Sequence, residues 1–129
     1  NRGKSPVFLI RHAQSTSNIA SSKMIQEAAG CDGLPISRWL EVYANEDFID
    51  SKLTEFGIEQ CLHASQFAKE FNFQVTFVSP MRRTLETAYY IFKEHPNFAT
   101  MKFVAHPILR EKLTTGGDVP LNKSDYEEY

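Results

Sequence analysis

Apolar residues in this chain occur both as short dense runs and as longer periodic stretches, which predict strands and helices respectively. Short runs rich in apolar and β-branched residues predict strands at residues 7–10, 74–79 and 102–105. Residues 7–10 read Val-Phe-Leu-Ile without polar alternation, so we expect that strand to be buried on both faces. A polar segment follows, in which Ser15 is placed to cap a helix extending to about residue 29.

Two later helices carry apolar stripes at helical spacing. The first begins at the N-cap Thr54; the second has Ser79 as its cap and Pro80 at its first position, and it ends near residue 93. The stripe of the first consists of Gly57, Cys61, Ala64, Ala68 and Phe71. The stripe of the second consists of Met81, Leu85, Ala88 and Phe92. We expect Gly57, which has no Cβ, to let its helix approach the sheet closely.

Residues 30–50 form a long excursion between the predicted core elements. Turn-forming residues precede a short helix predicted over residues 37–44, which would bury Trp39. Such excursions often form lids or specificity loops over an active site. The alternative is a surface segment whose tryptophan only covers the core, and the sequence leaves both interpretations open.

The end of the first strand carries the most informative polar residues. In open α/β sheets, ligands bind outside the carboxyl ends of the strands, where Arg11 and His12 would lie. Adjacent strand residues point to opposite faces, so both side chains can face one pocket only if the strand has ended there. The helix start after Ser15 would add unpaired backbone N–H groups, which favour a bound phosphate.

Residues 11–18, which read Arg-His-Ala-Gln-Ser-Thr-Ser-Asn, resemble the signature of the histidine phosphatase superfamily, with its phosphoglycerate mutase-like fold. That signature is a strand, then Arg-His-Gly, then an Asn six positions after the His. Asn18 occupies the place of that Asn, and Ala13 replaces the Gly.

Two further motifs resemble the same family. Residues 53–60 are similar to Leu-Thr-x-x-Gly-x-x-Gln, to which we assign a structural role and no chemistry. Residues 79–88 are similar to Ser-Pro-x-x-Arg-x-x-Gln-Thr-Ala, with Arg83 on the Arg of the motif and Glu86 in place of its Gln. The resemblance implies an α/β fold with three α/β/α layers and a mostly parallel sheet.

The resemblance also implies a site for phosphoryl transfer, and the residue types suit that chemistry. Arg11 and Arg83 offer planar guanidinium forks that bind phosphate oxygens, and Asn18 adds a neutral donor. His12 would be the nucleophile that accepts the phosphoryl group. Residues 108–111 resemble Leu-x-Glu of the family, so Glu111 would supply the proton to the leaving alcohol. We expect no metal site and no cofactor.

Helix geometry separates Arg83 from its neighbour Arg82. Helical side chains lean toward the N-terminus, so Arg83 in the first turn can reach over the end of the strand. Arg82 is spaced for an i,i+4 pair with Glu86 on an exposed face. The remaining histidines receive no catalytic role: they are His63, His95 and His106.

The expected activity is that of a phosphomonoester hydrolase working through a phosphohistidine intermediate on a small phosphorylated substrate. Mutases of the family usually carry Glu-Arg-x-Tyr-Gly at the acid, whereas this chain reads Glu111-Lys112-Leu113, which favours a phosphatase. The alternatives are a phosphoglycerate-type phosphomutase and a catalytically inactive binding or regulatory module with the same fold.

Net charge, the length of apolar runs and the cysteine content limit which partners and which cellular location we expect. Fourteen Lys and Arg against sixteen Asp and Glu give a net charge of −2, which argues against nucleic acid as a partner. No apolar run is long enough to cross a bilayer, so we expect no membrane partner. Cys31 and Cys61 stand alone, and two free thiols in a reducing, cytoplasmic compartment are the simplest interpretation.

Residues 1–129 are interpreted as the N-terminal portion of a single histidine phosphatase domain. By resemblance, the family completes its pocket with a second catalytic His on a later strand, and no His follows Glu111. We therefore expect the 129 residues alone to be inactive. The strand at residues 7–10 would then be an exposed sheet edge, through which the chain could self-associate.

Overall fold

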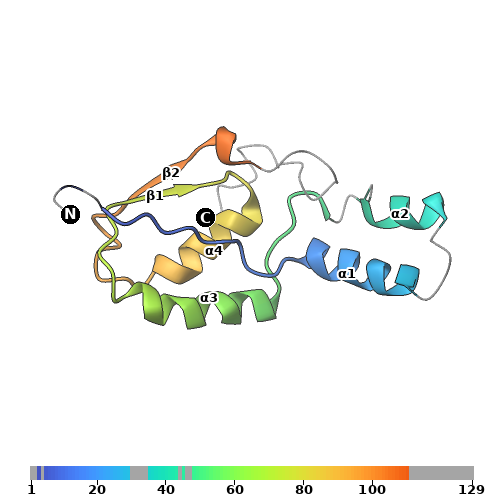
Figure 1. Cartoon of the computed structure of the whole chain (residues 1–129), viewed down its shortest axis with the longest axis horizontal. Helices are drawn as coiled ribbons and strands as arrows, with labels where there is room; N and C mark the ends of the chain where they lie inside the picture. The colour runs from blue at the N-terminus through green and yellow to red at the C-terminus, as the bar shows by residue number, and fades with distance from the viewer. Residues whose placement is uncertain (1–2, 4, 30–34, 44, 46–47, 111–129) are drawn as a thin grey trace.

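The computed structural model describes residues 3, 5–29, 35–43, 45 and 48–110 (Figure 1). Within them the elements are α1 (Thr16–Ala29), α2 (Ile36–Tyr43), α3 (Glu55–Ala68), β1 (Val75–Val78), α4 (Arg82–Phe92), β2 (Lys102–Ala105) and the 3₁₀ turn η2 (Pro107–Leu109). Each predicted helix is present, and so are the strands predicted at residues 74–79 and 102–105.

The two strands form a parallel sheet with α4 as the connection between them. Val75 pairs with Lys102 and Val78 with Ala105. Parallel strands need a long crossover, which here is one helix, as in a βαβ unit. This arrangement confirms the predicted α/β class with a parallel sheet and is consistent with a phosphoglycerate mutase-like fold.

The core lies where α3 and α4 pack against each other below the sheet (Figure 1). Its buried members are Leu53, Cys61, Ala68, Ile91, Phe92 and Met101. The stripe predicted for α3 is largely confirmed, but α3 ends at Ala68 and leaves Phe71 44% exposed. On α4 the polar residues Arg83, Glu86 and Thr87 are buried, while Leu85 and Ala88 are only half-buried.

The prediction of a buried strand at residues 7–10 is wrong. This segment runs alongside β1 in the fold (Figure 1), but it forms no strand, and Val7 and Leu9 are 85% and 95% exposed. Apolar patterning reports a tendency to be buried, whereas a strand also needs a partner at hydrogen-bonding distance. A cavity separates residues 7–10 from β1, so no ladder connects them. Phe8 is held by ring contacts with Phe71 and Phe73, at centroid distances of 4.7 and 5.2 Å.

The start of α4 also differs from the prediction, which placed Ser79 as its cap. The helix begins at Arg82 with Met81 at the N-cap position, which supplies no side-chain cap. The cap comes instead from Asp50, whose Oδ1 accepts a hydrogen bond from the Arg82 backbone N–H at 2.7 Å. Ser79 contributes its carbonyl oxygen, which accepts from Thr84 Oγ1 at 2.6 Å. A residue distant in sequence therefore accepts the hydrogen bond from a backbone N–H group in the first turn of α4, to which the helix itself offers no acceptor.

Helix α2 confirms the short helix predicted over residues 37–44, and it lies beside α1 (Figure 1). Arg38 joins the two helices, because its Nε and Nη2 donate to the two carboxylate oxygens of Glu27 at 3.0 and 2.9 Å. Arg38 also donates to Glu41 on its own helix. The role of residues 30–50 as a lid stays a prediction, and residues 30–34 lie outside the described part of the chain.

Candidate active site

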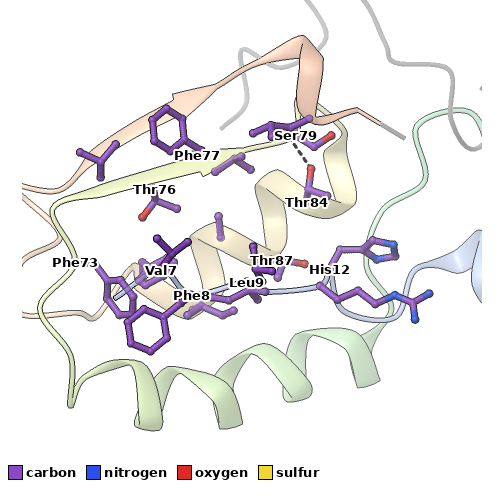
Figure 2. Close-up of a pocket in the computed structure, with 18 of the residues that line it drawn as sticks. Val7, Phe8, Leu9, His12, Phe73, Thr76, Phe77, Ser79, Thr84 and Thr87 are labelled. Atoms are coloured by element: carbon purple, nitrogen blue, oxygen red, sulfur yellow. Dashed lines mark hydrogen bonds between the residues drawn. The ribbon is translucent and has the colours of Figure 1, made fainter. Parts of the chain in front are cut away.

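A cavity of about 580 Å³ lies between residues 6–12, β1 and α4 (Figure 2). Its lining is mostly apolar, with Thr76 toward one end, and most of its polar side chains lie toward the other, where Figure 2 labels His12, Ser79, Thr84 and Thr87. Arg11 and Arg83 also line it. Three of the predicted site residues, Arg11, His12 and Arg83, are therefore brought to one cavity.

The imidazole of His12 is held by the backbone beside it. Its Nδ1 lies 2.8 Å from the carbonyl oxygen of Ala13. Because a carbonyl oxygen can only accept, Nδ1 carries the proton in this contact. In a neutral ring the lone pair then resides on Nε2, where it is available as a nucleophile or base.

Thr87 links the segment after His12 to α4. Its Oγ1 accepts from the Ala13 N–H at 3.1 Å and donates to the carbonyl oxygen of Arg83 at 2.6 Å. The loop that bears His12 and the helix that bears Arg83 are thus joined by one hydroxyl. Thr87 is the Thr of the third motif, and no role was expected for it from the sequence.

The two neighbouring arginines occupy different environments, as predicted. Arg83 is only 4% exposed and lines the cavity. Arg82 forms the predicted pair with Glu86, with 3.0 Å between Nε and Oε1. The face is not the exposed one we expected, because Glu86 is buried and its Oε2 accepts from the Leu53 N–H at 2.7 Å. A carboxylate in place of the usual Gln therefore accepts from two donors on two segments.

Asn18 does not line the cavity. Its Oδ1 accepts from the backbone N–H of Ser15 at 3.0 Å and from Ser15 Oγ at 2.9 Å. This arrangement resembles a capping box at the start of α1, where Ser15 has the N-cap position that we predicted. The phosphate-binding role of Asn18 remains a prediction.

The other candidates divide into those the structure explains and one it does not describe. His95 is buried, with Nε2 within 3.2 and 3.0 Å of the carbonyl oxygens of Ala68 and Phe71, and Nδ1 accepting from the Asn97 N–H at 3.1 Å. Both ring nitrogens serve the fold, which confirms its structural interpretation. His63 is exposed, as expected. Glu111, the predicted acid, lies outside the described residues.

The expectation that Gly57 brings α3 close to the sheet is wrong. A Cβ at this position would lie 2.2 Å from the carbonyl oxygen of Gln14, so the close approach is to the loop that follows His12. Gln60 contacts the same residue through a hydrogen bond from the Gln14 N–H to Oε1 at 3.0 Å. Thr54, Gly57 and Gln60 are three of the four residues that the second motif specifies, so the motif itself marks the residues that contact this loop.

Three further features of the described residues concern metal sites, membrane spans and the free cysteine. Among them, no three His, Cys, Asp or Glu side chains gather as a metal site would require. No helix in the same set is long and apolar enough to span a bilayer. Cys61 is a buried free thiol, and burial raises its pKa, so it is protected from reaction.

Fold and cavity together define an α/β protein of the phosphoglycerate mutase-like class. Residues 43–123, more than half of the chain, match the family model described as histidine phosphatase superfamily (branch 1), and the chain belongs to that family. The matched stretch contains the second and third motifs and starts after His12. The chain is also 33% identical over 96 residues to "Probable fructose-2,6-bisphosphatase TIGAR A" of Danio rerio, an alignment covering 67% of this chain. The aligned part of this chain covers 38% of the length of that relative.

Proposed function

We propose that this chain is part of a phosphomonoester hydrolase that forms a phosphohistidine intermediate on His12. The observation that carries the proposal is the grouping of Arg11, His12 and Arg83 around one cavity, with Nδ1 of His12 engaged by a carbonyl oxygen. Membership of the histidine phosphatase superfamily supports it.

In the first step, the guanidinium groups of Arg11 and Arg83 bind the phosphoryl oxygens and offset their charge. Nε2 of His12 attacks phosphorus, the P–N bond forms and the P–O bond to the alcohol breaks. Glu111 donates its proton to the departing alcohol oxygen. The arginines are needed most, because charge on the equatorial oxygens dominates this kind of transition state.

In the second step, water attacks the phosphorus of the phosphohistidine. The P–N bond breaks, the electron pair returns to Nε2, and the carboxylate of Glu111 takes the proton that water releases. Inorganic phosphate then leaves, and the enzyme regains its starting protonation state. The Lys112-Leu113 sequence after Glu111 favours this hydrolysis over transfer to a second hydroxyl.

The first substrate to test follows from the name of the Danio rerio relative, a probable fructose-2,6-bisphosphatase. We propose that the substrate is a small phosphorylated metabolite and that residues 1–129 belong to a single domain, with residues 30–50 closing over the site. We further propose a cytoplasmic location, where Cys61 and Cys31 would stay reduced.

A trapping experiment tests the proposal. The full-length protein is mixed with phosphoesters labelled with ³²P, including fructose 2,6-bisphosphate, and quenched within milliseconds. We expect protein-bound label that is labile in acid and stable in base, located on His12 and absent from His12→Ala. A protein that neither acquires label nor releases phosphate from a broad panel would instead be the inactive binding module.

A further inference from the structure

The peptide group between Ala13 and Gln14 has hydrogen bonds at both ends. Its carbonyl oxygen, on Ala13, accepts from Nδ1 of His12 at 2.8 Å. Its N–H, on Gln14, donates to Oε1 of Gln60 on α3 at 3.0 Å. One peptide plane therefore connects the side chain of Gln60 to the imidazole of His12.

Peptide geometry makes these two contacts interdependent. Because the peptide bond is planar and trans, its N–H and C=O point in opposite directions and rotate together. An acceptor that fixes the direction of the Gln14 N–H thereby fixes the direction of the Ala13 oxygen. Hydrogen bonds in such a chain also polarise one another, so an N–H that donates makes its own carbonyl a better acceptor.

The start of α3 restrains the other side of Gln14. The backbone N–H of Thr54 donates to the Gln14 carbonyl oxygen at 3.0 Å, and Thr54 Oγ1 donates to the Gln14 side-chain oxygen at 2.9 Å. Gly57 packs directly against this carbonyl, since a Cβ there would lie 2.2 Å from the oxygen. Gln14 therefore has both backbone polar groups paired with α3 and its N-cap residue.

We infer that Gln60 is a positioning residue for His12, acting through the Ala13–Gln14 peptide. Its acceptor oxygen sets the plane of that peptide, the peptide carbonyl keeps the proton on Nδ1, and Nε2 is left free toward the phosphoryl group. The orientation of His12 is a property of the structure, whereas its effect on turnover rests on the proposed function. Gln60 itself does not line the cavity.

The chain offers a matched control for this inference. Gln60 and Gln66 are both exposed residues of α3, and Gln66 lies far along the helix from Gln14. Gln60→Met removes the acceptor while keeping the length of the side chain, and Gln60→Glu keeps an acceptor oxygen. Gln66→Met makes the same chemical change without touching the loop. Because both positions are exposed, neither change should prevent folding.

The primary readout is the tautomer of His12 in the full-length protein, from ¹⁵N NMR of labelled histidine, with the signal assigned by its absence in His12→Ala. We expect Gln60→Met to lower the fraction of His12 protonated at Nδ1, and Gln60→Glu and Gln66→Met to leave it unchanged. With p-nitrophenyl phosphate as the probe, Gln60→Met should lower kcat about 5–10-fold, the equivalent of one hydrogen bond, with KM nearly unchanged.

Two results would overturn the inference: an unchanged His12 tautomer in Gln60→Met, or the same shift in Gln66→Met. A protein without turnover of any phosphoester would remove the proposed function, but the tautomer would still decide whether Gln60 orients His12. The two failures are therefore distinguishable.

Discussion

At the residue scale, the side chain of His12 is coupled to the backbone but is only half-buried, so it can be removed with little damage to packing. We expect His12→Ala to abolish turnover in the full-length protein and to shift its melting temperature only slightly. Phosphate release and differential scanning calorimetry measure the two effects. His63→Ala, at an exposed histidine of α3, serves as the control. Substantial activity in His12→Ala would refute the phosphohistidine mechanism.

Arg82 and Arg83 allow a paired prediction, because adjacent arginines have opposite surroundings. Arg83→Ala should cost about 2–4 kcal/mol of transition-state stabilisation, the usual cost of losing a donor to developing charge. Arg82→Ala should leave kcat/KM unchanged. It should lower the free energy of unfolding by about 1–3 kcal/mol, because the buried Glu86 carboxylate loses a charged donor. Steady-state kinetics and urea denaturation separate the two, and equal losses of activity would contradict the assignment.

Individual site residues were predictable where a motif named a reactive group. His12 and Arg83 could be selected as candidates because an imidazole and a guanidinium group are reactive types that a motif can name, and the structure places both along one cavity. Their roles in catalysis stay predictions. The sequence indicated no role for Thr87 and Gln60 because each contacts the loop after His12 only through a backbone N–H of that loop, and only the fold brings those groups together. Asn18 was chosen by its motif position, and the structure shows its side chain at the cap of α1, a contact that the motif did not indicate. Its phosphate-binding role stays a prediction.

At the scale of elements, the N-cap of α3 is the clearest sequence prediction to be confirmed. Thr54 Oγ1 accepts from the Gly57 N–H at 2.9 Å. Thr54→Ala should therefore lower the free energy of unfolding by about 0.5–2 kcal/mol, whereas Thr54→Ser, which keeps the oxygen, should lose less. Chemical denaturation measures both. An unchanged midpoint in Thr54→Ala would show that the cap contributes nothing to stability.

The cap of α4 explains why its start could not be predicted. Local rules favoured Ser79 followed by Pro80, a common N-terminal pattern. The structure uses Asp50, which has a positive φ of 44° and lies 32 residues before its partner Arg82. The local sequence indicates which residues are able to cap a helix. It does not indicate which carboxylate from a distant segment will accept from the backbone N–H groups of the first helical turn.

At the scale of the whole molecule, the parallel β1-α4-β2 unit followed from the order of apolar patterns, whereas the strand predicted at residues 7–10 did not form. The patterns at residues 7–10 and at β1 are both apolar, yet only β1 has a neighbour at ladder distance. Burial on both faces of a strand depends on how many strands the sheet contains, which no local pattern specifies.

The exposed residues 7–10 lead to a prediction about association. Leu9 is 95% exposed, and across the cavity β1 has one edge that pairs with no strand in the described part of the chain. Apolar segments and free edges of this kind pair readily with other chains. We therefore expect the isolated 129-residue chain to sediment, at micromolar concentration, as species larger than its 14.8 kDa monomer.

Charge at the centre of this segment should reverse the association. Leu9→Lys places a charge where a second copy would dock, so it should shift the sedimentation profile toward monomer with little change in melting temperature. Leu40→Lys, at a Leu on α2 that is 57% exposed, is the matched control and should change nothing. An isolated chain that is monomeric at every concentration would contradict the prediction. So would an equal effect of Leu40→Lys, because association would then reflect general surface hydrophobicity and not the edge beside β1.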